Sequence, residues 1–107
     1  MMQASQRRMM QELPQADVVI TNPTHYAVAI SYDAEKYDAP RVIAKGEDYL
    51  AQKIKEIAKE NDIEIVENKP LARMLYANVD VGDFVPPELY QAVAEVLAFV
   101  YHLKGKV

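Results

Sequence analysis

The sequence of 107 residues contains no cysteine, only three glycines and no long apolar run. Without cysteine, the chain can form no disulfide, no thiolate nucleophile and no cysteine-based metal site. This composition fits a reducing compartment, so the cytoplasmic side is the expected location. The few glycines, with no repeat or low-complexity tract, predict that the segments pack into one unit without flexible linkers.

Membrane spans, nucleic-acid binding and metal binding are likewise not expected. No apolar stretch approaches the about 20 residues needed to cross a bilayer, and the polar start lacks the apolar core of a signal peptide. The formal net charge of −4 argues against a protein that neutralises phosphate backbones. The two histidines, His25 and His102, lie far apart without a matching carboxylate spacing, so the sequence indicates neither a metal site nor a cofactor.

Apolar residues make up 50% of the chain, which is enough for one domain with a modest core. Short β-branched runs alternate with stretches of helical spacing, so we predict an α/β fold in which a small central sheet of about four strands is surrounded by about four helices. The expected strands are 17–21, 26–32, 41–44 and 63–66, and the expected helices are 3–12, 46–60, 70 onward and 87–103.

For the four helices, the sequence also predicts which residues face inward and where one helix begins. The first helix has a thin apolar face, Met9 and Met10, which indicates an exposed or frayed helix. Gly46 is expected to open the second helix, and the third should turn Leu71, Met74 and Leu75 inward. The last helix is strongly apolar through Leu89, Val93, Val96, Leu97 and Val100.

The tetrad Asn22-Pro23-Thr24-His25 lies between the first two expected strands. Such residues are ordinary in turns, so a purely structural role is one interpretation. A chemical role is the other. Because Pro23 has no backbone N–H, it cannot attack the Asn22 side chain, but the Asn22 side-chain nitrogen can attack the main-chain carbonyl of the same residue. That cyclisation would break the Asn22–Pro23 bond.

A fold can accelerate this slow reaction by holding nucleophile and carbonyl together and by supplying a group that transfers protons. His25, three residues after Asn22, is the candidate for proton transfer. The alternative is that His25 merely caps the turn. For His102, near the end of the last helix, a surface or dipole-compensating role is favoured over catalysis.

Several blocks resemble one family in order and spacing: DVVITNPTHYAVA (17–29), APRV (39–42), AKG (44–46), PLAR (70–73) and YQAVAEVLA (90–98). They are similar to the cytoplasmic domain of the FlhB/YscU export-switch family of type III secretion systems, and the flagellar branch fits better than the injectisome branch. The resemblance implies a single-turnover cleavage within the tetrad by asparagine cyclisation, with Asn22 as nucleophile and scissile residue. Pro23, Thr24 and His25 complete the family motif.

The resemblance also implies a setting. Family members carry an N-terminal transmembrane domain, so residues 1–13 are expected to be the stub of a linker helix and 14–107 the switch domain. Such a domain lies on the cytoplasmic face of the bacterial inner membrane, and contact with the membrane would come only through the absent N-terminal domain. The implied partners are rod- and hook-type export substrates, a length-control ruler protein and other components of the export gate.

A docking patch for export substrates is predicted at Ala39, Pro40, Ala94 and Leu97, if the last helix packs beside the third strand. The alternative for Ala94 and Leu97 is a place in the core. For the chain as a whole, two other functions stay open. One is a non-cleaving interaction module of the export gate. The other is a small-molecule enzyme that uses His25 with nearby carboxylates, which is disfavoured because the chain has only Ser5 and Ser31 and no glycine-rich phosphate loop.

Overall fold

The computed structural model describes residues 4–23 and 25–105. Within these residues one sheet of four strands is surrounded by four α-helices, which confirms the predicted α/β class. The elements, in chain order, are α1 (Ala4–Glu12), η1 (Leu13–Gln15), β1 (Val18–Asn22), β2 (Tyr26–Ser31), β3 (Arg41–Glu47), α2 (Asp48–Glu60), β4 (Glu64–Glu67), α3 (Lys69–Asn78), η2 (Pro87–Leu89) and α4 (Tyr90–Leu103).

The strand order is β3-β2-β1-β4, so the first strand of the chain lies inside the sheet. β1 pairs with β2 as an antiparallel hairpin and with β4 in parallel. Val18, Val19 and Ile20 are each 0% exposed. Because neighbouring side chains of a strand point to opposite faces, a continuous β-branched run such as this one suits a strand covered on both sides.

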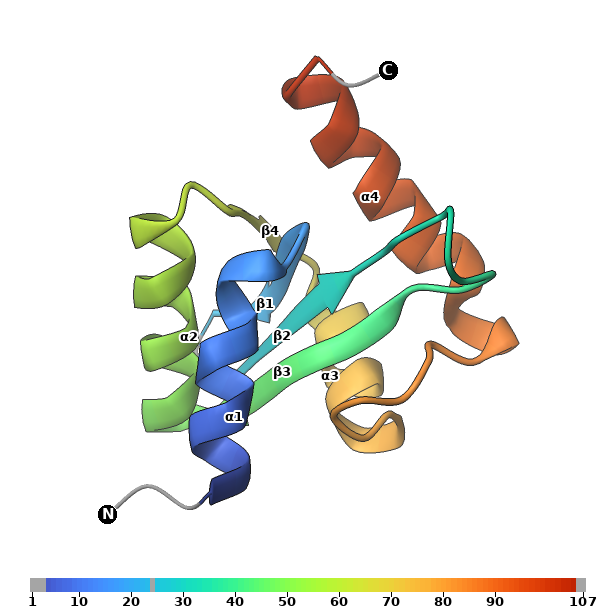
Figure 1. Ribbon diagram of the computed structural model, residues 1–107. Coiled ribbons are helices and arrows are strands. Elements are labelled where there is room, and N and C mark those ends of the chain that lie inside the picture. Colours follow the sequence, from blue (N-terminus) through green and yellow to red (C-terminus); the bar gives the residue numbers. More distant parts are fainter. Residues whose placement is uncertain (1–3, 24, 106–107) are drawn as a thin grey trace.

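Two helical layers cover the sheet, with α1 and α2 on one face and α3 and α4 on the other (Figure 1). Val18 and Ile20 belong to the core beneath α3 and α4, whereas Val19 belongs to the core beneath α1 and α2. The small side chains Ala27 and Ala29 of β2 also face α1 and α2. The side chains of the first two strands are therefore divided between two cores.

The expectation of an exposed first helix was wrong. Met9 is only 5% exposed and packs in the core on the α2 side, and Leu13 just after the helix is fully buried. The Sδ atom of Met9 accepts a hydrogen bond from the Lys45 main-chain N–H at 3.4 Å, which ties α1 to β3. One long, adaptable side chain is enough to anchor this helix, because its partner is a sheet face and not another amphipathic helix.

Gly46 does not open the second helix, because β3 runs on to Glu47 and α2 begins at Asp48. The reason for a glycine here is a close approach. A Cβ atom built on Gly46 would lie 2.6 Å from Cγ of Leu50, in the first turn of α2. The glycine therefore lets the chain turn directly from β3 into the helix.

The third and fourth helices follow the predictions with one exception. Leu71 and Leu75 of α3 are buried, but Met74 is 48% exposed. Ala72 takes the inward position in its place, because the buried stripe of this short helix is narrow. In and just before α4, the expected inward residues are all buried, namely Leu89, Val93, Val96, Leu97 and Val100. None of the helices in the described part of the chain is both long and apolar enough to pass through a bilayer.

We predict that Gly46→Ala lowers the free energy of unfolding by about 1–3 kcal/mol, because the added methyl group overlaps Leu50 in a packed region. Urea unfolding followed by circular dichroism measures the change. In a Leu50→Ala background the overlaps with Cγ and Cδ2 are removed and only that with Cβ, at 2.8 Å, remains, so the same substitution should cost less. An equal cost in both backgrounds would mean that the contact with Leu50 is not the reason for the glycine.

Candidate functional site

Asn22 is the last residue of β1 and pairs with Tyr26, the first residue of β2. It is only 7% exposed, and together with Thr21 it is a buried polar residue at the end of an otherwise apolar strand. Pro23 lies half-buried in the connecting turn, and His25 is exposed. Thr24, the remaining member of the predicted tetrad, lies outside the described residues. The hairpin thus brings Asn22 and His25 to the two sides of one tight turn.

The main-chain carbonyl of Asn22 accepts a hydrogen bond from the His25 N–H at 2.9 Å. This carbonyl carbon is the one that the Asn22 side-chain nitrogen would attack. A fixed N–H donor polarises the carbonyl and can hold the negative charge that develops on its oxygen during attack. Sequence reasoning considered only the imidazole of His25, whereas this contribution comes from its main chain.

Helix α2 holds the other carbonyl groups of the turn. The Asp48 N–H donates to the His25 carbonyl oxygen at 2.9 Å, and the Lys55 ammonium donates to the Pro23 carbonyl oxygen at 3.2 Å. Neither residue was among the predicted site residues, because no local pattern links them to the turn. Together they hold the backbone at Pro23 and at His25.

The His25 side chain lies on the outer side of the turn, where it is 61% exposed. Its Nδ1 atom is 3.9 Å from Oδ1 of Asp48, and its ring centroid is 6.0 Å from that of Tyr26. An imidazole in this position can exchange protons with water while staying attached to the turn through its main chain.

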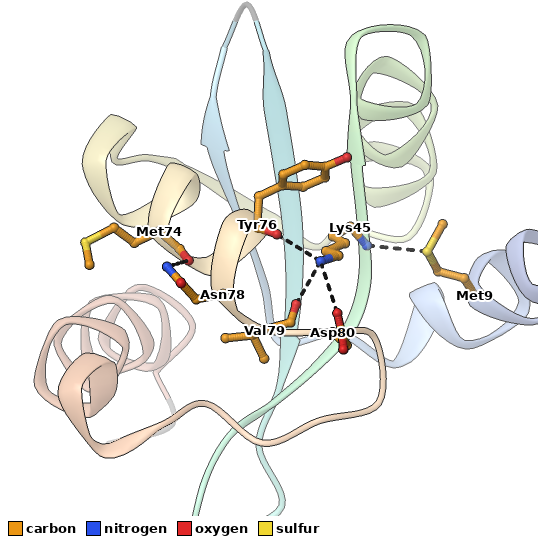
Figure 2. Close-up of polar contacts among 7 residues, drawn as sticks. All are labelled: Met9, Lys45, Met74, Tyr76, Asn78, Val79 and Asp80. Carbon is orange, nitrogen blue, oxygen red and sulfur yellow. Dashed lines mark hydrogen bonds and ion pairs between the residues drawn. The ribbon is translucent and has the colours of Figure 1, made fainter.

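A stack of side chains supports the strand residue opposite Asn22. The Tyr26 ring stacks on Tyr76 of α3 with centroids 4.6 Å apart. Figure 2 shows the Lys45 ammonium below the Tyr76 ring, where it donates to the carbonyl oxygens of Tyr76 at 2.8 Å and Val79 at 3.0 Å. A cation at the end of α3 satisfies carbonyls that have no partner within the helix. Burial, with a smaller contribution from nearby carboxylates, raises the pKa of the Tyr76 phenol.

Three of the four predicted docking residues line the same groove. Pro40, Ala94 and Leu97 line one groove of about 280 Å³ between α4 and the loop before β3. Ala94 is exposed, whereas Leu97 is 3% exposed and closes the floor of the groove, so Leu97 belongs to the core as well. Ala39 is buried and lines a neighbouring hollow instead. Residues that were not predicted complete the groove, namely Tyr32, Asp38, Tyr90, Ala98 and Tyr101.

The remaining histidine, His102, is exposed in the last turn of α4, away from the turn at Asn22. Across residues 4–23 and 25–105, no group of three or more histidine, aspartate or glutamate side chains is arranged to hold a metal ion. The groups that the described residues place at the turn are an amide, an imidazole, an ammonium and a carboxylate.

Comparisons with known proteins agree with the blocks found in the sequence. The model of the FlhB HrpN YscU SpaS family matches residues 1–100. The flagellar biosynthetic protein FlhB of Bacillus subtilis is 60% identical over 101 residues, which cover 94% of this chain but only 28% of that protein. The chain thus spans less than a third of the length of this relative.

Solved structures show the same fold. The crystal structure of the cytoplasmic domain of FlhB from Shewanella putrefaciens matches with a TM-score of 0.87 at 48% identity, covering 94% of this chain and 81% of that one. A mutated EscU C-terminal domain matches with a TM-score of 0.82 at 29% identity, covering 86% of this chain and 92% of that one. The chain therefore belongs to the FlhB HrpN YscU SpaS family and has the C-terminal domain of its flagellar FlhB branch.

Proposed function

We propose that this domain cleaves its own backbone once, between Asn22 and Pro23, and that it acts in a flagellar type III export apparatus to switch the specificity for export substrates. One observation carries the cleavage proposal. The carbonyl of a buried asparagine, at the end of a rigid strand, accepts a 2.9 Å hydrogen bond from the His25 N–H and is followed by proline.

In the proposed reaction, the Asn22 side-chain nitrogen attacks the Asn22 main-chain carbonyl carbon and closes a five-membered ring. Negative charge develops on the carbonyl oxygen, where the His25 N–H already donates. The bond to the Pro23 nitrogen then breaks. One proton leaves the attacking nitrogen and one reaches the proline nitrogen, so the products are a C-terminal succinimide at Asn22 and a secondary amine at Pro23.

The fold contributes mainly by holding the reacting groups in place. An amide is a poor electrophile because resonance stabilises it, and an amide nitrogen is a poor nucleophile. Orientation of the two can lower such a barrier by several kcal/mol, to a limit of about 7–11 kcal/mol. β1 is paired on both sides as far as Thr21, Asn22 pairs with Tyr26, and Lys55 and Asp48 hold the turn, so the backbone next to the scissile bond is restrained.

The setting of the domain follows from the family. We propose that residues 1–13 form part of a linker helix toward a transmembrane domain and that 14–107 form the switch domain at the cytoplasmic face of the inner membrane. The packing of Met9 on β3 would connect a movement of the linker directly to the sheet. The partners of the switch domain would be export substrates, a length-control ruler protein and other components of the export gate.

The groove beside α4 is the proposed docking site for those substrates. Its walls are mainly apolar, with Pro40 on one side and Ala94 on the other, and Leu97 closes the floor. An export gate must accept many unfolded clients, so a short apolar segment bound weakly in a small groove suits its task. The exposed methyl group of Ala94 leaves room for such a segment.

We predict that the wild-type chain separates under denaturing conditions into pieces of 22 and 85 residues, the second beginning with Pro23. Asn22→Ala should abolish cleavage because it removes the attacking nitrogen. Intact-mass spectrometry measures the pieces, and Asn78→Ala, which alters an exposed asparagine on α3, serves as the control. A wild-type chain that stays whole would support the alternative of a non-cleaving module, and cleavage of Asn22→Ala would exclude cyclisation.

The two pieces should stay together after cleavage. The first piece contributes β1, whose Val18, Val19 and Ile20 are fully buried, and each such side chain stabilises the complex by about 1.5–3 kcal/mol. Gel filtration of the cleaved protein in native buffer should show one species, whereas urea should separate the pieces. Loss of the shorter piece in native buffer would contradict this prediction.

Ala94→Asp should weaken binding of a rod- or hook-type export substrate at least about tenfold, because it puts a charge into an apolar groove. Because Ala94 is exposed within α4, the free energy of unfolding should fall only by the difference in helix propensity between alanine and aspartate, about 0.7 kcal/mol or less. Ala77→Asp, at an exposed alanine on α3, is the matched control, and calorimetric titration measures binding. Unchanged binding in Ala94→Asp would exclude this groove as the docking site.

A further inference from the structure

Asp48 contacts His25 twice. Its main-chain N–H donates to the His25 carbonyl oxygen at 2.9 Å, and its Oδ1 atom lies 3.9 Å from the His25 Nδ1 atom. We propose that the Asp48 carboxylate is a positioning residue for autocleavage, which orients the His25 imidazole beside the scissile bond. This inference rests on the proposed cleavage at Asn22–Pro23.

The backbone at Asp48 is unusual. Its φ angle is +50°, in the left-handed region, although it is the first residue of α2. Among residues with a side chain, aspartate and asparagine adopt this conformation most readily. The chain turns sharply here from β3 into α2, and this turn brings both the N–H and the carboxylate of Asp48 to His25. The fold thus adopts a costly conformation at the residue that contacts the turn.

A simpler role for Asp48 is to stabilise the N-terminus of α2, since a carboxylate in the first turn interacts favourably with the helix dipole. That role does not require contact with His25. The two roles differ in what the carboxylate acts upon, the helix or the imidazole. They can therefore be separated by asking whether the effect of Asp48 on cleavage depends on His25.

The chemistry of the pair indicates what the carboxylate would do. At 3.9 Å from Nδ1 the carboxylate lies beyond hydrogen-bond distance, so it would act on the imidazole through its charge, by favouring the ring orientation in which Nδ1 faces Asp48 and Nε2 faces away from it. Both side chains are well exposed, at 61% for His25 and 74% for Asp48, so solvent screens the interaction. We therefore expect an effect of only about three- to fivefold on the rate.

The experiment measures the rate of fragment formation by mass spectrometry after refolding from denaturant, in wild type, Asp48→Asn and Asp48→Gly. Both variants keep the main-chain N–H and tolerate a positive φ, but neither carries the carboxylate. Each should cleave about three- to fivefold more slowly than wild type. Glu60→Gln, which removes an exposed carboxylate at the other end of α2, should cleave at the wild-type rate.

The decisive measurement repeats Asp48→Asn in a His25→Ala background. His25→Ala alone should slow cleavage and keep the main-chain donor to the Asn22 carbonyl. If Asp48 acts through the imidazole, Asp48→Asn should then add no further slowing. In addition, the difference between wild type and Asp48→Asn should shrink in 1 M salt, because exposed charges are screened there.

Three results would overturn the inference. Equal slowing by Asp48→Asn with and without the His25 imidazole would assign Asp48 to the helix. An unchanged rate in Asp48→Asn, while the wild-type chain cleaves normally, would exclude the carboxylate and leave the proposed function intact. A wild-type chain that never cleaves would overturn the proposed function and this inference with it.

Discussion

The position of β1 inside the sheet is the constraint on which the rest of the structure depends. It pairs with β2 on one side and β4 on the other, and its side chains fill both cores. β1 is restrained on four sides as far as Thr21, and its last residue, Asn22, remains buried and paired with Tyr26. The same burial explains why a chain break just after β1 need not unfold the domain. Most contacts of the strand are with the sheet and the helices, and these contacts do not depend on the turn.

The turn combines a buried asparagine, which is the proposed reacting residue, with an exposed histidine. Asn22 is held by the sheet, whereas the His25 side chain reaches solvent, and main-chain hydrogen bonds connect the two. Such a division suits a reaction that needs fixed geometry at the carbonyl but exchange of protons with water. Contacts from Lys55 and Asp48 come from one helix, so α2 serves as the common support of the turn.

The turn and the groove lie at opposite ends of β2. Tyr26 begins the strand beside the turn, and Tyr32, just beyond its other end, lines the groove. A break at Asn22–Pro23 therefore frees one end of the strand that leads to the groove, while the pairing with β1 and β3 remains. This connection gives a physical route by which cleavage could affect the docking of substrates without a large rearrangement.

The α/β class, the order of the elements and the chemistry open to Asn22-Pro23 could be predicted from the sequence, because they follow from local periodicity and from the missing N–H of proline. The burial of Met9, the exposure of Met74 and the position of Ala39 outside the groove became known only from the packing of the elements. The hydrogen bonds that Asp48 and Lys55 donate to the turn likewise became known only from the three-dimensional structure. Each of these features depends on contacts between residues far apart in the chain, which no pattern within a few neighbouring residues encodes.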